Sequence, residues 1–157
     1  MTKQPFLFLD IDGVLNSLGS LDPWGDAERH VLYPYGIGPL PVTLSRRMAD
    51  AINDLGCEIW WTTTWQEEAY LVGDIIGIKG HVLDLDSQPG WKHGAVNNKI
   101  YDEPRPFIWF EDHPGVYGTN GLAGREHWPP HFVWNPSPMT GLTPEVIERA
   151  HEFLRGL

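Results

Sequence analysis

Short apolar runs and stretches with helical spacing alternate along the chain, and they predict an alternating order of strands and helices. The run at residues 6–10, four apolar residues and then an acid, is typical of a strand covered on both faces, as in a parallel sheet. Four later runs predict further strands, at residues 58–62, 81–85, 107–110 and 131–134.

Apolar residues that recur at helical spacing predict four helices. Thr43 is the expected N-cap of the first, which carries Met48 and Ile52 on its apolar side. The other three are expected at residues 66–76, at 91–99 and after Thr143-Pro144. Strands that alternate with helices favour an α/β fold, a Rossmann-like three-layer α/β/α sandwich around a mainly parallel sheet.

Two long segments lack this periodicity and are rich in proline and glycine. Residues 17–42 are too long for a simple connection, so we expect a functional loop or a small cap there. Residues 113–130 are expected to form a second loop. We interpret residues 1–157 as one domain, because this length suits a single core.

Charge and composition exclude several classes of protein. The 21 acidic and 11 basic residues give a formal net charge of −10, which opposes attraction to membranes and to an extended nucleic-acid surface. There is no apolar run of about 18 residues and no signal-peptide pattern, so we expect a cytoplasmic location. Cys57 is the single cysteine, which excludes an internal disulfide. The sequence does not indicate the oligomeric state.

Polar residues that can carry chemistry follow three of the predicted strands. Asp10 and Asp12 follow the first, Thr62-Thr63-Thr64 the second and Glu111-Asp112 the fourth, while Lys92 lies between the last two. In open parallel sheets, ligands bind beyond the carboxyl ends of the strands, where the strand order reverses. We therefore expect these side chains to meet at one edge of the sheet.

Each of these residue types has a use in phosphoryl transfer. A carboxylate that attacks a phosphate ester is an anion approaching an anion, so a metal ion and an ammonium group must offset the charge. A short hydroxyl can hold a phosphoryl oxygen, and paired carboxylates offer the oxygen ligands that Mg²⁺ takes. A protonated carboxyl near the leaving oxygen avoids the expulsion of a free alkoxide.

The motif DIDGVLN, which follows a hydrophobic strand, resembles the nucleophile motif of the haloacid-dehalogenase-like (HAD) phosphatase superfamily. The segments WWTTTWQEEA, WKHGAV, RPFIWFEDH and TGLT follow in the order of that family. Together they are similar to the small HAD domain that occurs alone in phages and bacteria and as a module of "Swiss Army knife" RNA-repair proteins. The similarity covers most of the chain but is sparse between the motifs.

This resemblance implies a HAD-like fold with a minimal cap. It implies a Mg²⁺-dependent phosphohydrolase that forms an aspartyl-phosphate from a phosphomonoester, such as a nucleotide or a nucleic-acid terminal phosphate. Asp10 would be the nucleophile, and Asp12 would protonate the leaving group and then activate water. Thr63 is the expected hydroxyl of the second motif, and Lys92 would steady the nucleophile and the phosphoryl charge.

The resemblance also implies two sets of ligands. The expected Mg²⁺ ligands are Asp10, Asp12, Glu111 and Asp112, with Asp12 acting through its backbone carbonyl. The residues expected to contact the substrate are Gly13, Asn16, Thr63, Thr64 and Lys92. Many relatives have two aspartates where this chain has Glu111-Asp112, so the longer Glu111 either approaches the metal or hydrogen-bonds Lys92. Thr62 and Thr64 are alternatives to Thr63.

Other classes of protein share parts of this pattern. A phospho-acceptor receiver domain also combines acids, threonine and lysine, but it has no acid pair after the lysine. A catalytically silent binding module of the same fold is another alternative, and a dehalogenase is disfavoured because it does not need Asp12. His113, His127 and His131 invite a zinc site, but the prolines between the last two exclude a helix and no cysteine lies nearby.

Overall fold

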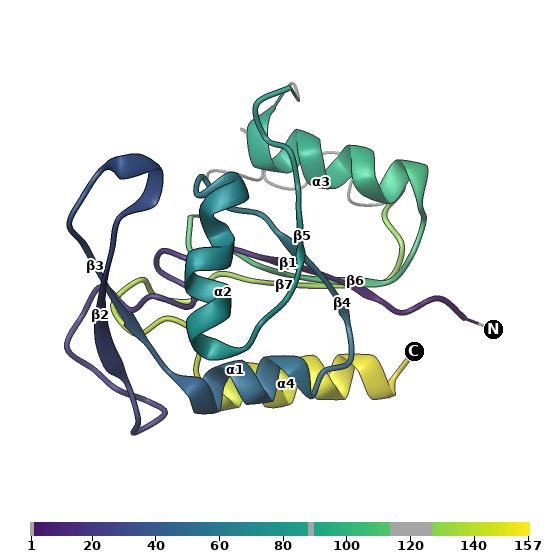
Figure 1. The fold of residues 1–157 in the computed structure, drawn as a ribbon. Helices are drawn as coiled ribbons and strands as arrows, with labels where there is room; N and C mark the ends of the chain where they lie inside the picture. Colours follow the sequence, from purple (N-terminus) through teal and green to yellow (C-terminus); the bar gives the residue numbers. More distant parts are fainter. Residues whose placement is uncertain (1, 88–89, 114–126) are drawn as a thin grey trace.

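The structure is a computed structural model that describes residues 2–87, 90–113 and 127–157, and within them five parallel strands form the central sheet (Figure 1). Their order across the sheet is β5-β4-β1-β6-β7. The strands are β1 (Phe6–Leu9), β4 (Glu58–Trp61), β5 (His81–Val82), β6 (Phe107–Phe110) and β7 (His131–Trp134). The predicted α/β class with a parallel, Rossmann-like sheet is confirmed.

Helices cover both faces of this sheet. They are α1 (Arg46–Asn53), α2 (Tyr70–Ile76), α3 (Trp91–Asp102) and α4 (Pro144–Arg155). Leu7 and Leu9 of β1 belong to the core beneath α1, α2 and α4, whereas Phe6 and Phe8 belong to the core beneath α3. This alternation follows from the period of two along a strand. Because both faces are covered, β1 and β6 are completely buried, as their unbroken apolar runs predict.

The order of the strands marks one position as special. After β1, the strands β4 and β5 are added on one side of it. The chain then crosses over, and β6 and β7 are added on the other side of β1. β1 is therefore the strand at which the order reverses, with β4 and β6 as its two neighbours. A ligand crevice is expected outside its carboxyl end, directly at Asp10.

The segment 17–42 contributes most of a hairpin that sequence periodicity does not indicate. It consists of β2 (Glu28–Leu32), the short 3₁₀ turn η1 (Pro34–Gly36) and β3 (Leu40–Leu44), with the two strands antiparallel. Five of its ten strand residues are buried or half-buried, and each strand has a polar residue among them, His30 on β2 and Thr43 on β3, so the sequence shows no clear apolar face. Figure 1 shows this hairpin beyond the carboxyl edge of the central sheet.

The start of the first helix differs from the prediction. Thr43 is not its N-cap, because Thr43 pairs with Arg29 across the hairpin. Ser45 caps α1 instead, and its hydroxyl accepts a hydrogen bond of 3.0 Å from the backbone N–H of Met48. Both residues are good caps, and the strand pairing of the hairpin decides between them.

Other boundaries shift by a few residues. The predicted strand at 81–85 is reduced to His81–Val82, and the predicted helix at 91–99 continues to Asp102. The predicted helix at 66–76 begins as the 3₁₀ turn η2 (Gln66–Ala69). The strands at 107–110 and 131–134 are confirmed. The predicted loop at 113–130 lies mostly outside the described residues.

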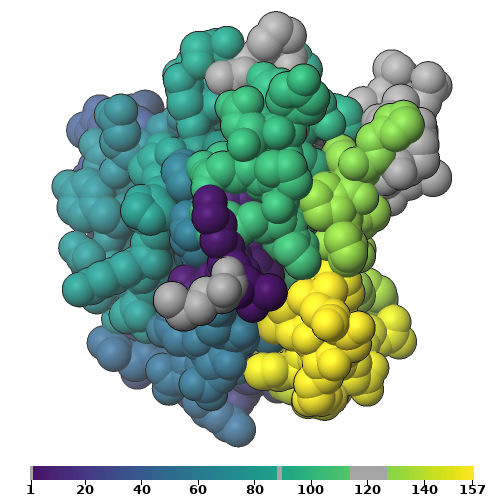
Figure 2. Space-filling model, turned by 90° about the vertical axis from the view of Figure 1, so that its right-hand side faces the viewer, coloured from purple at the N-terminus to yellow at the C-terminus, as the bar shows by residue number. Residues whose placement is uncertain are grey.

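The amino edge of the sheet lies opposite the hairpin. Figure 2 looks onto this edge and shows the N-terminal segment, in purple, between α3 in green and the end of α4 in yellow. Among the described helices, none is long and apolar enough to cross a membrane.

Candidate active site

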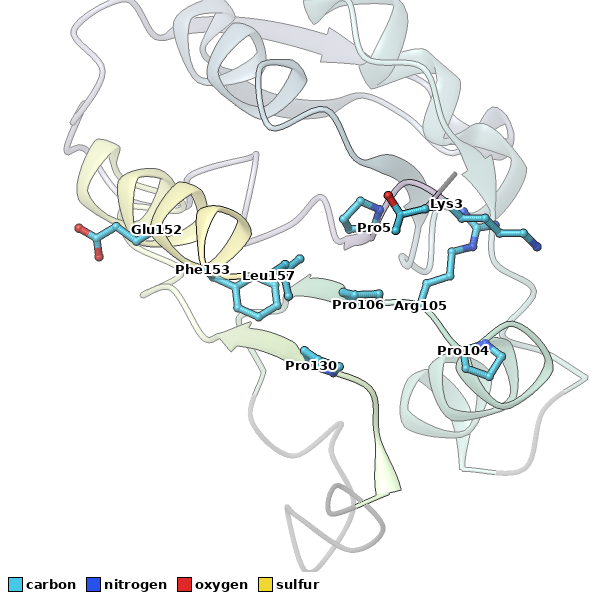
Figure 3. Close-up of a pocket in the computed structure, with 11 residues that line it drawn as sticks. Lys3, Pro5, Pro104, Arg105, Pro106, Pro130, Glu152, Phe153 and Leu157 are labelled. Carbon is cyan, nitrogen blue, oxygen red and sulfur yellow. The ribbon is translucent and has the colours of Figure 1, made fainter.

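A large cavity of about 950 Å³ lies at the amino edge, far along the strands from the predicted acids. Figure 3 shows Phe153 and Leu157, at the end of α4, beside Pro106 and Pro130 in the wall of this groove. The guanidinium of Arg105, which lines the groove, donates hydrogen bonds to the carboxylates of Glu58 and Glu103, at 2.7 and 2.8 Å. The lining of this groove includes one acid, Glu152, and the paired acids of the chain lie at the opposite, carboxyl edge.

A tight turn follows β1 at the carboxyl edge. The carbonyl of Ile11 accepts hydrogen bonds from the backbone N–H groups of Val14, Leu15 and Asn16, at 3.2, 2.9 and 2.9 Å. The backbone N–H of Gly13 donates to the carbonyl of Asn16 at 2.9 Å and closes the turn. The chain thus reverses immediately after the strand and keeps the residues of DIDGVLN together at the edge.

Gly13 is required by its conformation and by its neighbour. Its φ is +76°, in the left-handed region that favours glycine. A Cβ atom on Gly13 would lie only 2.2 Å from Oδ2 of Asp112. The missing side chain therefore allows the turn after β1 to approach the acid that follows β6.

Lys92 joins the acids at the ends of β1 and β6. Its Nζ lies 2.9 Å from Oδ2 of Asp10 and 2.7 Å from Oε2 of Glu111. All three side chains are buried, with exposed fractions of 4% for Lys92, 7% for Asp10 and 1% for Glu111. Of the two expectations for Glu111, the ion pair with Lys92 is the one that the structure forms.

Burial shifts the protonation of this cluster. Burial and the negative charge of Asp10 raise the pKa of Glu111 to about 9, against the opposing effect of Lys92. Burial also raises the pKa of Asp10, again against Lys92. Burial alone would lower the pKa of Lys92, but the charges of Asp10 and Glu111 outweigh it and raise that pKa. The ammonium stays charged, and the two acids together tend to retain a proton.

We expect the free energy of unfolding to decrease as the pH rises from about 5 to about 9. The carboxyl of Glu111 titrates near its ordinary value of 4.5 in the unfolded chain and at about 9 in the folded protein. The folded state therefore binds more protons than the unfolded state in this window, and stability falls with rising pH. Urea unfolding in EDTA near pH 5, 7 and 9 measures this slope.

Glu111→Gln is expected to flatten that decline, since glutamine does not titrate. Glu152→Gln, at an exposed position on α4, is the matched control and should keep the wild-type slope. Carboxylates with lowered pKa, such as Glu103 at about 2, lose their contribution only below this window. An unchanged slope in Glu111→Gln would contradict the assignment of the proton to this cluster.

Asp12 does not join the lysine cluster. Its Oδ1 accepts a hydrogen bond of 2.9 Å from Nδ2 of Asn16, and its Oδ2 accepts one of 3.0 Å from Nε1 of Trp65. Asn16 is buried, and its amide oxygen also accepts a 2.8 Å hydrogen bond from the backbone N–H of Thr43. Both the nitrogen and the oxygen of the Asn16 amide are thus hydrogen-bonded within the protein, and its predicted contact with a substrate stays a prediction.

The three threonines after β4 are placed differently. The hydroxyl of Thr62 donates to the carbonyl of Trp60 at 3.1 Å, within its own strand. The hydroxyl of Thr63 accepts from the backbone N–H of Trp65 at 3.2 Å, which leaves its own proton for a ligand. Thr62 and Thr63 are buried and Thr64 is exposed. Of the two buried hydroxyls, that of Thr63 is therefore the one free to donate to a ligand.

Among the described residues, one group of acids could hold a metal ion. Asp10, Glu111 and Asp112 each offer a carboxylate oxygen, and these oxygens all lie within 4.8 Å of one another. His113, His127 and His131 do not form such a group within the described part of the chain. An all-oxygen set suits a hard cation such as Mg²⁺ better than it suits zinc.

Strained backbone conformations adjoin the site. Among the described residues other than glycine, three have a positive φ: Tyr35 at 53°, Gln66 at 47° and Trp91 at 54°. Trp91 immediately precedes Lys92, and Gln66 immediately follows Trp65. Such conformations cost about 1–3 kcal/mol each and persist where the surroundings impose them. Two of the strained residues are thus next in sequence to side chains that contact the acids, Lys92 and Trp65.

Comparison of the chain with family models, with curated proteins and with solved structures gives no match. The geometry of the site therefore stands on the residues of this chain alone.

Sequence reasoning missed several residues that shape the site. Trp65 is buried in the core, and its indole also donates to Asp12. The amide of Asn135, after β7, donates to the carbonyl of Glu111 at 2.6 Å. Gln66 donates to the carbonyls of Thr63 and Leu83, at 2.7 and 3.1 Å. The WWTTTWQ segment places Trp65 and Gln66 near the site, but nothing in the sequence points to Asn135.

Proposed function

We propose that this protein is a Mg²⁺-dependent phosphohydrolase of the HAD-like class that acts through an aspartyl-phosphate at Asp10. The observation that carries the proposal is the meeting of Asp10, Lys92, Glu111 and Asp112 beyond the carboxyl end of the central strand. Lys92 lies 2.9 Å from Asp10 and 2.7 Å from Glu111, and an acid oxygen of Asp112 completes a group within 4.8 Å. These residues come from three separate segments, so their meeting is a property of the fold.

The surroundings of Asp10 suit a nucleophile. One carboxylate oxygen accepts a 2.8 Å hydrogen bond from the backbone N–H of Ile11, and the other is paired with Lys92. These contacts fix the carboxylate in one orientation at the end of a buried strand. Lys92 also supplies the positive charge that an approaching phosphate dianion needs.

The carboxylates present fit Mg²⁺. Asp10 and Asp112 are the residues that would hold it, with the backbone carbonyl of Asp12. Glu111 is less suited, because Lys92 occupies Oε2 and the backbone N–H of His113 donates to Oε1 at 3.2 Å. The chemistry that bound Mg²⁺ supplies is compensation of negative charge on the phosphoryl oxygens.

The proposed hydrolysis has two steps, and residues of the site have distinct roles in them. A carboxylate oxygen of Asp10 attacks phosphorus, the bond from phosphorus to the ester oxygen breaks, and Asp12 gives its proton to the departing oxygen. Water next attacks the phosphorus of the aspartyl-phosphate, Asp12 takes a proton from that water, and Asp10 is regenerated as phosphate leaves. Lys92 offsets the negative charge of the phosphoryl group, and the hydroxyl of Thr63 donates a hydrogen bond to one of its oxygens.

We expect Mg²⁺-dependent hydrolysis of p-nitrophenyl phosphate, which EDTA abolishes and added Mg²⁺ restores. Asp112→Asn should raise the Mg²⁺ concentration needed for half-maximal activity by about tenfold or more, since an amide oxygen is a weaker ligand than a carboxylate. Asp102→Asn, at an exposed position on α3, is the matched control and should leave this concentration unchanged. Hydrolysis that persists unchanged in EDTA would contradict the proposed metal dependence.

The proposed substrate is a phosphomonoester, with nucleotides and nucleic-acid terminal phosphates as the leading classes. The hairpin would be a minimal cap, which leaves the site open to a large group that bears a terminal phosphate. The net charge of −10 disfavours an extended nucleic-acid surface and does not oppose binding of one terminal phosphate. A phosphate-release panel of nucleotides, 3′- and 5′-phosphorylated oligonucleotides and sugar phosphates tests this class. Activity on sugar phosphates alone would defeat it.

A further inference from the structure

The carboxylate of Asp12 is held from two sides by neutral donors. The side-chain amide of Asn16 donates to Oδ1 at 2.9 Å, and the indole of Trp65 donates to Oδ2 at 3.0 Å. Asp12 is only half-buried, so water would otherwise share these oxygens and let the side chain turn. The two N–H groups instead give the carboxylate one orientation.

Both of these donors are in turn hydrogen-bonded to the hairpin. The backbone N–H of Thr43, on β3, donates to the amide oxygen of Asn16 at 2.8 Å. The hydroxyl of Tyr35, in the η1 turn, donates to the backbone carbonyl of Trp65 at 2.7 Å. The hairpin therefore contacts each of the two residues that hold Asp12, through one hydrogen bond at its tip and one on its second strand.

Strained backbone lies at one partner of the contact at the tip, Tyr35, and directly beside the other, Trp65. Tyr35 has a φ of 53°, and Gln66, directly after Trp65, has a φ of 47°. The side chain of Gln66 is fixed by the carbonyls of Thr63 and Leu83 and by the backbone N–H of Leu85. The segment that carries Trp65 is thus anchored to the sheet, and Tyr35 is anchored to that segment although the residue is 53% exposed.

We propose that Trp65 is a positioning residue for Asp12, and that the hairpin, through the Tyr35 hydroxyl, sets the orientation that Trp65 imposes. This inference rests on the proposed function, because it concerns the proton that Asp12 exchanges with the leaving group. An ordered Asp12 matters most when the leaving oxygen is a poor leaving group, since that oxygen must be protonated as its bond to phosphorus breaks. A good leaving group departs without this help.

Two conservative variants test the inference against two matched substrates. Trp65→Phe removes the indole N–H but keeps an aromatic ring, and Tyr35→Phe removes only the hydroxyl. The substrates are p-nitrophenyl phosphate, with a good leaving group, and phenyl phosphate, with a poorer one. We expect Trp65→Phe to lower kcat on phenyl phosphate about tenfold or more, and on p-nitrophenyl phosphate less than about threefold. Tyr35→Phe should also lower the ratio of kcat on phenyl phosphate to kcat on p-nitrophenyl phosphate, by a smaller factor.

Each variant has a matched control in this chain. Trp60 donates its indole N–H to a carboxylate of Glu58 at the same distance of 3.0 Å, in the core beneath α3. Tyr33 lies on the hairpin, and its hydroxyl makes no hydrogen bond to the described residues. Trp60→Phe and Tyr33→Phe should leave the ratio of the two rates at its wild-type value.

The outcomes separate this inference from the proposed function. Equal losses on both substrates, or no loss on either, would overturn the positioning role while wild-type hydrolysis still upholds the phosphatase. A wild-type protein that hydrolyses neither substrate overturns both. If Trp65→Phe fails to fold, Tyr35→Phe carries the test, because it alters only the hydroxyl of a half-exposed side chain.

Discussion

Asp10→Asn is expected to lower kcat for p-nitrophenyl phosphate by at least about 1,000-fold, because an amide cannot replace the attacking carboxylate. The fold should survive, since asparagine has nearly the same size and Lys92 keeps Glu111 as a partner at 2.7 Å. Steady-state kinetics gives the rate, and circular dichroism with thermal unfolding checks the fold.

Trapping of the phosphorylated protein makes this result specific to the nucleophile. Wild type that is quenched in acid during turnover of a labelled substrate should carry a hydroxylamine-sensitive acyl phosphate, and Asp10→Asn should carry none. Asp74→Asn, at an exposed position on α2, is the matched control and should match wild type in rate and labelling. Near-wild-type turnover by Asp10→Asn would remove Asp10 from the proposed role.

Lys92→Met is expected to lower the free energy of unfolding by about 3–5 kcal/mol near neutral pH, as is usual when one partner of a buried ion pair is removed. Methionine fills a similar volume but leaves Asp10 and Glu111 buried together without a cation. Urea unfolding in EDTA measures the loss. The same variant should also lose hydrolysis, because the charge beside the phosphoryl group is gone.

Another lysine on the same helix provides the comparison. Lys99 pairs with Glu103 at 2.5 Å, but it is 18% exposed and Glu103 is 31% exposed. Lys99→Met should therefore cost much less than Lys92→Met. The double variant Lys92→Met/Glu111→Gln should have a higher free energy of unfolding than Lys92→Met, since it removes one of the two buried acids that lack a cation. Equal costs for the two lysines would show that the Lys92 cluster is no stronger than a surface pair.

The fold could be predicted where buried strands leave a strong apolar signal. The runs around Leu7 and Ile108 mark strands covered on both faces, and the structure places them side by side at the centre of the sheet. The hairpin could not be predicted in this way, because its strands are short, half of their residues are exposed and Pro41 interrupts the second. For the same reason Thr43 read as a helix cap, although pairing with Arg29 holds it in a strand.

The candidate site shows a similar division. Chemistry and order along the chain indicate Asp10, Lys92 and the acids after β6, and the structure brings them within hydrogen-bonding or ligand distance of one another. The environment of Asp12 depends instead on contacts between residues far apart in sequence. A tyrosine and a tryptophan look the same in the sequence whether they pack a core or orient a carboxylate, so the roles of Tyr35 and Trp65 emerge only from their hydrogen bonds.

The two ends of the chain leave the molecule on the side away from the acids. Figure 1 shows the N and C labels near the amino edge of the sheet, whereas the hairpin and the carboxyl ends of the strands lie on the opposite side. A flexible linker attached at either end would begin on the side of the sheet opposite the acids. The architecture is thus compatible with tethering to a second protein domain, in front of it or behind it, without loss of access for a bulky phosphorylated molecule.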